Sequence, residues 1–261
     1  MSAIDCCRGL PRPVREYFDP TEGEISLEEV QERLQPQIDA WRGNDVRNEA
    51  FWTIWAGVEQ NPRIFAKYLL NEFKREGIAK GTVVDLGCGS GLDALELFAA
   101  GWNVIAVDSS QGALDILKSK VKELKKALSR HHRNHPGDQI KMGTLKTVRS
   151  PIESYTFPSG KVEIVLALDS LNYCHPAEML RIWNRAHEAL KTGGRILCSL
   201  PRAPLFPFTT TFANMVAPSW YTDPIAFHAL LRRKGYVEEY FRYSGRGVFS
   251  PTMMLAIGKK A

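Results

Sequence analysis

No stretch of this 261-residue sequence approaches the run of about 20 apolar residues that a membrane-spanning helix needs. The first seven residues also lack the apolar core of a secretory signal. Cysteines are few: there are five, an odd number, and no two have the C-x-x-C spacing of a zinc or redox site. We therefore expect a cytoplasmic protein without a membrane span, a disulfide scaffold or a bound metal.

Charge is distributed unevenly along the chain. The formal net charge is +5, and much of the excess lies between Lys118 and Lys141. Such a cluster could attract an anionic partner, although a solvated helix face is the commoner explanation. Nucleic acid is thus a conceivable partner that the sequence does not favour. The remaining composition, 44% hydrophobic and 24% charged residues, is typical of a globular protein.

The first 60 residues predict a helical cap in front of a second domain over residues 61–261. Ser26-Leu27-Glu28-Glu29 has the form of a capping box and is followed by apolar residues spaced three and four apart. A second helical stretch runs from about Asn48 to Gly57. A third runs from about Pro62 to Phe73, and Gly77 fits its C-terminal end.

From Thr82 onward, short apolar runs alternate with helical patterns, which predicts right-handed βαβ units and a parallel sheet. Strands are expected over residues 82–86, 103–108, 164–168 and 195–200, and helices over about 92–100, 111–128 and 177–190. Residues 191–194 are expected to form a turn. After a helix from Thr222 to about Gly235, two strands over residues 236–243 and 253–259 have only a short connection and should be antiparallel.

Three glycines mark the expected ligand site. Gly87, Gly89 and Gly91 directly follow the strand over residues 82–86, and glycine lets a ligand approach the backbone with no Cβ in the way. Asp108, at the end of the next strand, is placed to accept hydrogen bonds from ribose hydroxyls. The spacing is not the G-x-G-x-x-G of dinucleotide sites. Asp85 would repel a pyrophosphate but could hold the amino group of a methionine moiety.

Three segments carry a resemblance to one enzyme family. Residues 83–91 look like its first motif, residues 104–110 like its second, and residues 190–196 like the turn before its fifth strand. On these motifs the chain resembles the class I S-adenosylmethionine-dependent methyltransferases. The resemblance implies a Rossmann-like three-layer α/β/α sandwich with a mostly parallel seven-stranded sheet and an antiparallel last strand. It also implies methyltransferase activity with S-adenosyl-L-methionine as the cofactor.

The resemblance assigns cofactor contacts but departs from the family on the adenine side. The acid that many members place after the third strand falls near Ser150 or Pro151, so Ile152 is expected to pack on the adenine and Glu153 to accept from its amino group. A non-catalytic protein that binds the cofactor is therefore one alternative. The expected cofactor-binding residues are Asp85, Gly87, Cys88, Gly89, Gly91, Asp108, Ser109, Ile152, Glu153 and Leu168.

The expected catalytic residues follow the fourth strand, where open α/β sheets bind ligands. His175 is the first candidate for a general base, and Asp169 and Tyr173 are the alternatives. A base is needed only when the acceptor must lose a proton. A histidine at this place can also simply pack against or cap the following helix.

Aromatic residues suggest the kind of acceptor. The expected substrate-binding residues are Trp52, Trp55, Tyr173, Phe208 and Trp220, for each of which plain core packing is the alternative. Together they favour a small, partly apolar acceptor that is methylated at oxygen, nitrogen or carbon. Methylation of RNA or protein through the basic segment of residues 118–141 is the second hypothesis. A monomer or a homodimer is expected.

Overall fold

A computed structural model describes residues 70–71, 73–137, 140–174, 178–201, 235–244 and 253–261. The expected helical cap over residues 1–60 and the expected helix after Thr222 lie outside these ranges. The described ranges contain most of the expected strands and helices.

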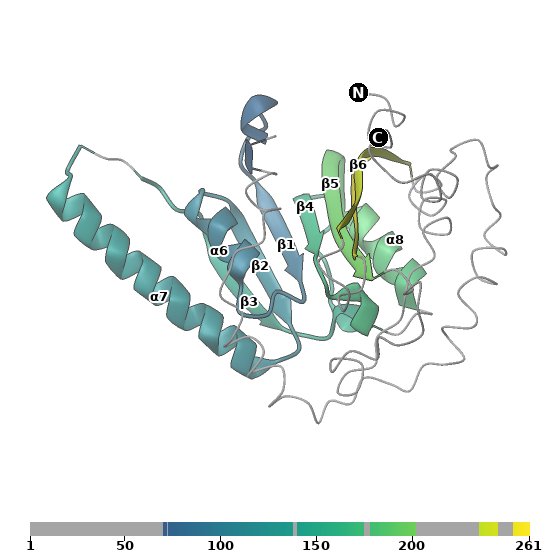
Figure 1. The fold of residues 1–261 in the computed structure, drawn as a ribbon, viewed down its shortest axis with the longest axis horizontal. Helices are drawn as coiled ribbons and strands as arrows, with labels where there is room; N and C mark the ends of the chain where they lie inside the picture. Colours follow the sequence, from purple (N-terminus) through teal and green to yellow (C-terminus); the bar gives the residue numbers. More distant parts are fainter. Residues whose placement is uncertain (1–69, 72, 138–139, 175–177, 202–234, 245–252) are drawn as a thin grey trace.

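Strands and helices alternate along most of the described chain (Figure 1). The strands are β1 (Thr82–Leu86), β2 (Asn103–Asp108), β3 (Leu145–Arg149), β4 (Val162–Ala167), β5 (Leu190–Pro201), β6 (Tyr236–Ser244) and β7 (Met253–Lys260). The helices are α6 (Leu92–Ala99), α7 (Gln111–Asn134) and α8 (Met179–Ala189), and the 3₁₀ turns are η2 (Ile152–Ser154) and η3 (Leu171–Tyr173).

The strands form one sheet in the order β3-β2-β1-β4-β5-β7-β6. Strands β1 to β5 pair in parallel, whereas β7 runs antiparallel to both β5 and β6. This confirms the expected, mostly parallel sheet with an antiparallel last strand. The strand order reverses between β1 and β4, and ligands bind at such switch points in open α/β sheets.

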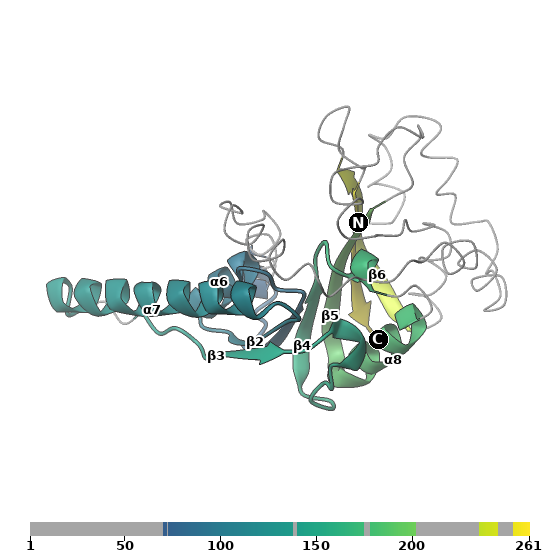
Figure 2. The same cartoon turned by 90° about the horizontal axis from the view of Figure 1, so that it is seen from below.

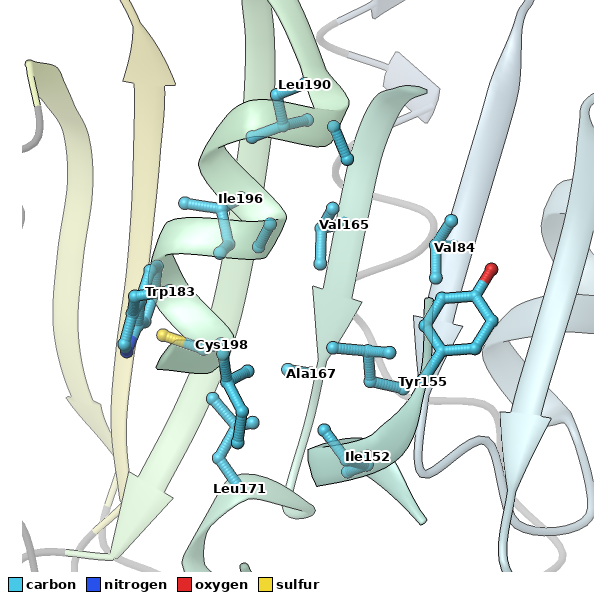
Figure 3. Close-up of a cluster of buried hydrophobic side chains, with 14 of the residues drawn as sticks. Val84, Ile152, Tyr155, Val165, Ala167, Leu171, Trp183, Leu190, Ile196 and Cys198 are labelled. Atoms are coloured by element: carbon cyan, nitrogen blue, oxygen red, sulfur yellow. The ribbon is translucent and has the colours of Figure 1, made fainter. Parts of the chain in front are cut away.

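Helices cover both faces of the sheet, which makes three layers (Figures 1 and 2). On one face, Leu97 of α6 and Leu117 of α7 belong to the same buried cluster as Val83 of β1. On the other face, Trp183 of α8 belongs to a cluster with Val84 (Figure 3). Because neighbouring residues of one strand are buried on opposite faces, the central strands read as continuous apolar runs.

Three local features differ from the expectations and a fourth confirms one. Strand β3 is not among the strands expected from apolar runs, because it lies at the sheet edge and none of its residues is fully buried. Residues 191–194, expected as a turn, belong to β5, and α7 continues six residues beyond the expected end. Gly77 ends a helical stretch as expected: its φ is 65° and its N–H donates to the Lys74 carbonyl at 3.3 Å.

Candidate cofactor site

The glycine turn after β1 is fastened to the end of β2. The N–H groups of Gly87 and Cys88 donate to the Val107 carbonyl at 2.8 and 3.0 Å. Gly87, Gly89 and Gly91 have φ values of 68°, 54° and 76°. In this left-handed region a residue with a Cβ is strained. The turn therefore needs glycine for its backbone conformation, apart from any ligand.

Asp108 links the glycine turn to the start of α7. Its Oδ2 accepts from the Gly89 N–H at 2.8 Å, and its Oδ1 accepts from the Ser110 N–H at 2.8 Å. Ser110 in turn caps α7, since its hydroxyl accepts from the Ala113 N–H at 3.1 Å. A carboxylate has about four acceptor positions, so two backbone donors orient Asp108 in a way compatible with further bonds from ribose hydroxyls.

Two carboxylates from different strand ends lie near the Cys88 thiol. Burial raises the pKa of Cys88 well above its usual value, and the negative charges of Asp85 and Asp108 raise this pKa further. Asp85 itself is only 5% exposed. The two acids that were predicted to bind the methionine and ribose parts of one ligand thus both lie near this thiol. Between them the thiol stays neutral and packs as a small apolar group.

Residues of η2 and of the segment after β4 contact the glycine turn at Gly87. A Cβ on Gly87 would lie 2.4 Å from the Ser170 Cβ and 3.5 Å from the Ile152 Cδ1. Both neighbours are buried, and the Ser170 hydroxyl has no hydrogen-bond partner in the described structure. Buried polar groups usually have partners. The Ser170 side chain thus fills the space beside Gly87, and its orphaned hydroxyl fits a site built to receive a ligand.

Asp169 occupies an unusual backbone conformation just after β4. Its φ is 52°, the one positive value for a non-glycine residue within the described ranges. Its N–H donates to the Ser199 Oγ at 2.7 Å, and the Ser199 hydroxyl donates to the Asp169 Oδ1. Ser199 is buried on β5, whereas Asp169 is exposed. Backbone strain of this kind persists where surrounding contacts hold it, and it is commonest at functional sites.

Glu153 contacts other protein groups through both its side chain and its backbone. Burial raises the pKa of the Cys174 thiol, and the charge of Glu153 and its hydrogen bond to the thiol raise it further. The Glu153 carbonyl accepts from Arg185 Nη2 at 2.6 Å, while Arg185 Nη1 donates to the Tyr155 carbonyl at 3.2 Å. Glu153 is thus tied to η3 and α8, and its contact with adenine stays a prediction.

The other expected site residues divide into two groups. Leu168 is buried directly after β4, Ser109 is exposed beside Asp108, and Tyr173 is half-buried in η3. His175 and four expected substrate-binding residues lie outside the described residues: Trp52, Trp55, Phe208 and Trp220. The general base at His175 and the aromatic pocket therefore stay predictions.

Sequence reasoning missed two residues that shape the site, Ser199 and Arg185. Ser199 lies in an apolar run, and only the β4–β5 register, in which Ala167 pairs with Cys198, brings it beside Asp169. Within the described ranges, no cluster of three or more metal-ligating side chains could hold a metal ion. The helices in those ranges include none long and apolar enough to cross a membrane.

One family model matches the middle of the chain. Residues 84–198 match the family model described as a methyltransferase domain. The cypemycin N-terminal methyltransferase of a Streptomyces species is 51% identical over 39 residues, which are 15% of this chain. The matched stretch spans 16% of that relative's length.

Solved structures show the same fold. Magnesium protoporphyrin IX methyltransferase from Synechocystis PCC 6803, with bound SAH, has a TM-score of 0.57 and 15% identity, covering 95% of this chain and 98% of that chain. A SAM-dependent methyltransferase from Leishmania major has a TM-score of 0.57 and 12% identity, covering 82% of each chain. The described strands and helices therefore have the fold of S-adenosylmethionine-dependent methyltransferases, and residues 84–198 match a methyltransferase domain.

Proposed function

We propose that this chain is an enzyme that transfers the methyl group of S-adenosylmethionine to an oxygen, nitrogen or carbon atom of a small molecule. The observation that carries the proposal is that the ends of β1, β2 and β4 meet at the glycine turn, where Asp108 accepts from the Gly89 N–H. The family match over residues 84–198 supports the same activity.

In this proposal the cofactor extends across the glycine turn. Gly87, Cys88, Gly89 and Gly91 form the floor, Asp85 holds the amino group of the methionine part, and Asp108 binds the ribose. The orientation of the Asp108 carboxylate by two backbone N–H groups supports its role. The remaining expected contacts, on the adenine side, are Ser109, Ile152, Glu153 and Leu168. The approach of Ile152 to Gly87 supports its place in this set.

The chain's own contribution to methyl transfer is positioning and, for some acceptors, proton removal. When bound, the cofactor supplies an electrophilic methyl group whose bond to sulfur breaks as the bond to the acceptor forms. Alignment of the acceptor with that methyl group lowers the barrier. A base is needed for a hydroxyl or a protonated amine. The exposed Asp169 carboxylate, fixed by Ser199, is the best supported base, and Tyr173 and His175 are the alternatives.

The proposed class of methyl acceptor is argued from the aromatic residues of the sequence. The aromatic residues Trp52, Trp55, Tyr173, Phe208 and Trp220 favour a small, partly apolar molecule. A cytoplasmic location is part of the proposal. The free, buried thiols of Cys88, Cys174 and Cys198 are compatible with it.

Transfer of labelled methyl groups tests the acceptor class. The purified protein is incubated with methyl-labelled S-adenosylmethionine and a metabolite, RNA and protein extract. The label is separated into acid-soluble and acid-precipitable fractions, and chromatography resolves the acid-soluble products from unreacted S-adenosylmethionine. We expect label in acid-soluble molecules, and loss of that label with Asp108→Ala. Label confined to precipitable RNA or protein would refute the small-molecule acceptor. Binding of the cofactor with no transfer to either fraction would refute the enzymatic proposal.

A further inference from the structure

Helix α7 carries a charge equal to that of the entire protein. It holds seven of the 34 Lys and Arg residues of the chain but only two of the 29 Asp and Glu residues, Asp115 and Glu123. The helix therefore has five net positive charges, and the net charge of the whole chain is +5. All other residues together are electrically balanced. The excess charge that the sequence placed between Lys118 and Lys141 is thus concentrated on one helix.

Most of these cations share one side of α7. Positions spaced three and four residues apart lie on the same side of a helix. The residues that line a shallow depression along this side are Lys118, Val121, Lys122, Lys125, Lys126, Ser129, Arg130 and Arg133. We call this set the basic face. From Lys118 to Arg133 it extends over roughly 22 Å of helix axis, at about 1.5 Å per residue.

Four cations of the basic face have no intramolecular partner in the described structure. Lys118 forms an ion pair with Asp115, and Lys125 lies over the Phe98 ring. In contrast, Lys122, Lys126, Arg130 and Arg133 are exposed, and no described carboxylate pairs with them.

The spacing within the basic face works against helix stability. Lys118, Lys122, Lys126 and Arg130 follow each other at intervals of four residues. Like charges at this spacing repel and destabilise a helix. A solvated helix face that served stability alone would place acids between these positions. The arrangement is better explained by an external anion that relieves the repulsion.

The basic face belongs to the part of α7 that extends away from the core. The buried residues of this helix are Ala113, Leu114 and Leu117, all in its first two turns. Beyond Leu117, Val121 and Leu124 are only partly buried. Figures 1 and 2 show the rest of α7 running outward past the edge of the sheet. A large ligand can therefore reach the basic face without covering the glycine turn.

We propose that the basic face of α7 binds the phosphodiester backbone of double-helical nucleic acid. A duplex presents one negative charge per about 1.7 Å of its axis, so a row of cations over roughly 22 Å meets many phosphates. The basic face has no aromatic side chain on which unpaired bases could stack, which disfavours a single strand as the ligand. The binding would depend on charge rather than on base sequence.

The same composition disfavours a protein or a membrane as the partner. Protein interfaces are anchored by aromatic and large apolar side chains and are poor in lysine, and Val121 is the one apolar residue that lines the depression. A membrane-binding helix inserts an apolar side into the lipid. The apolar side of α7, with Leu114 and Leu117, is instead buried against the sheet.

Binding of a labelled duplex of about 20 base pairs to the full chain, measured by fluorescence anisotropy, tests this proposal. We expect the affinity to fall on the order of 100-fold between about 50 mM and about 200 mM salt, as for about four released counterions. The variant K122Q/K126Q/R130Q should lose at least 10-fold in affinity, and its salt slope should decrease by about 3. Equal binding by parent and variant, or no binding by the parent at low salt, would overturn the proposal.

A matched variant tests whether duplex binding depends on the basic face or only on the net charge of the protein. K74Q/K80Q/K161Q removes the same number of exposed positive charges from outside α7 and should bind the duplex like the parent. The variant K122R/K126R keeps the charges and should also retain binding. Polyglutamate and vesicles of anionic lipid are compared under the same conditions. If either binds at least as tightly as the duplex, the partner is an acidic protein or a membrane and the proposal is wrong.

Stability and cofactor binding show whether the folded domain is intact. We expect K122Q/K126Q/R130Q to melt at the temperature of the parent or higher, because it removes like-charge repulsion. Its affinity for S-adenosylmethionine should be unchanged, since the substituted residues lie outside the glycine turn. The duplex-binding result thus stands independently of the proposed methyl transfer.

Discussion

The buried Ser199 of β5 holds Asp169 through both its backbone and its side chain. The Ser199 Oγ accepts from the Asp169 N–H at 2.7 Å, and the Ser199 hydroxyl donates to the Asp169 carboxylate. Asp169 thereby keeps a left-handed backbone conformation at the carboxyl end of β4. This edge of the sheet is where the proposed acceptor binds.

Removal of the Ser199 hydroxyl should therefore destabilise the domain. We expect Ser199→Ala to lower the free energy of unfolding by about 1–2 kcal/mol, because it leaves the Asp169 N–H without this partner. The loss should be smaller in an Asp169→Gly background, since that background already lacks the carboxylate that accepts from the Ser199 hydroxyl. Urea unfolding of the four proteins of this double-mutant cycle measures the difference. Equal losses in both backgrounds would contradict a specific link between the two residues.

The close contact of Gly87 with Ser170 predicts that alanine at position 87 lowers the free energy of unfolding much more than alanine at position 160 does. Gly87→Ala places a Cβ 2.4 Å from the Ser170 Cβ, whereas a Cβ on Gly160 would meet nothing within 4 Å. Both residues have φ near 60°, so both substitutions cost about 1 kcal/mol in backbone strain. We expect Gly87→Ala also to abolish S-adenosylmethionine binding. Similar unfolding energies and retained binding in both variants would show that the turn is not packed as described.

The buried thiol of Cys88 predicts a dependence of stability on pH. Because burial and the nearby acids raise its pKa in the folded state, the folded protein keeps the thiol proton after the unfolded chain has lost it. This stabilisation is present below the unfolded pKa of about 8.5 and is lost as pH rises above it. Urea unfolding of the parent and of Cys88→Ala at pH about 8 and about 10 tests this. The parent should lose more stability, and an equal loss would contradict the prediction.

The same burial predicts slow chemical modification. The thiolate is the reactive form of cysteine. Cys88 and Cys174 should therefore be alkylated at least about 10-fold more slowly in the folded protein than in urea at pH about 8. Mass spectrometry of the alkylated peptides gives the rate at each cysteine. Rapid alkylation of folded protein at Cys88 would show that the turn is open or that the thiol is ionised.

The sequence could predict those features that depend on local patterns. The bounds of β1 and β2 match the expected ones, because each is a buried apolar run that ends at a distinctive polar or glycine residue. Edge strand β3 was missed because it contains the exposed residues Lys146 and Arg149 and forms no apolar run.

Features of the site that depend on contacts between distant residues could not be predicted. The pairing of Ser199 with Asp169 follows from the register of two strands. The engagement of Glu153 with Cys174 and Arg185 depends on how η2, η3 and α8 pack. No pattern along the chain signals either of them, whereas the motif around Gly87, Gly89 and Asp108 is local enough to be recognised.

Calorimetric titration with S-adenosylmethionine tests the account most directly, with the parent, Asp108→Ala and the exposed-acid control Asp115→Ala. We predict that the parent and Asp115→Ala bind equally. Asp108→Ala should bind more weakly by about 1.5–3 kcal/mol, or roughly 10- to 150-fold, the scale of hydrogen bonds to a charged group. If the parent binds neither S-adenosylmethionine nor S-adenosylhomocysteine, or if Asp108→Ala binds like the parent, the cofactor does not lie where the glycine turn meets Asp108.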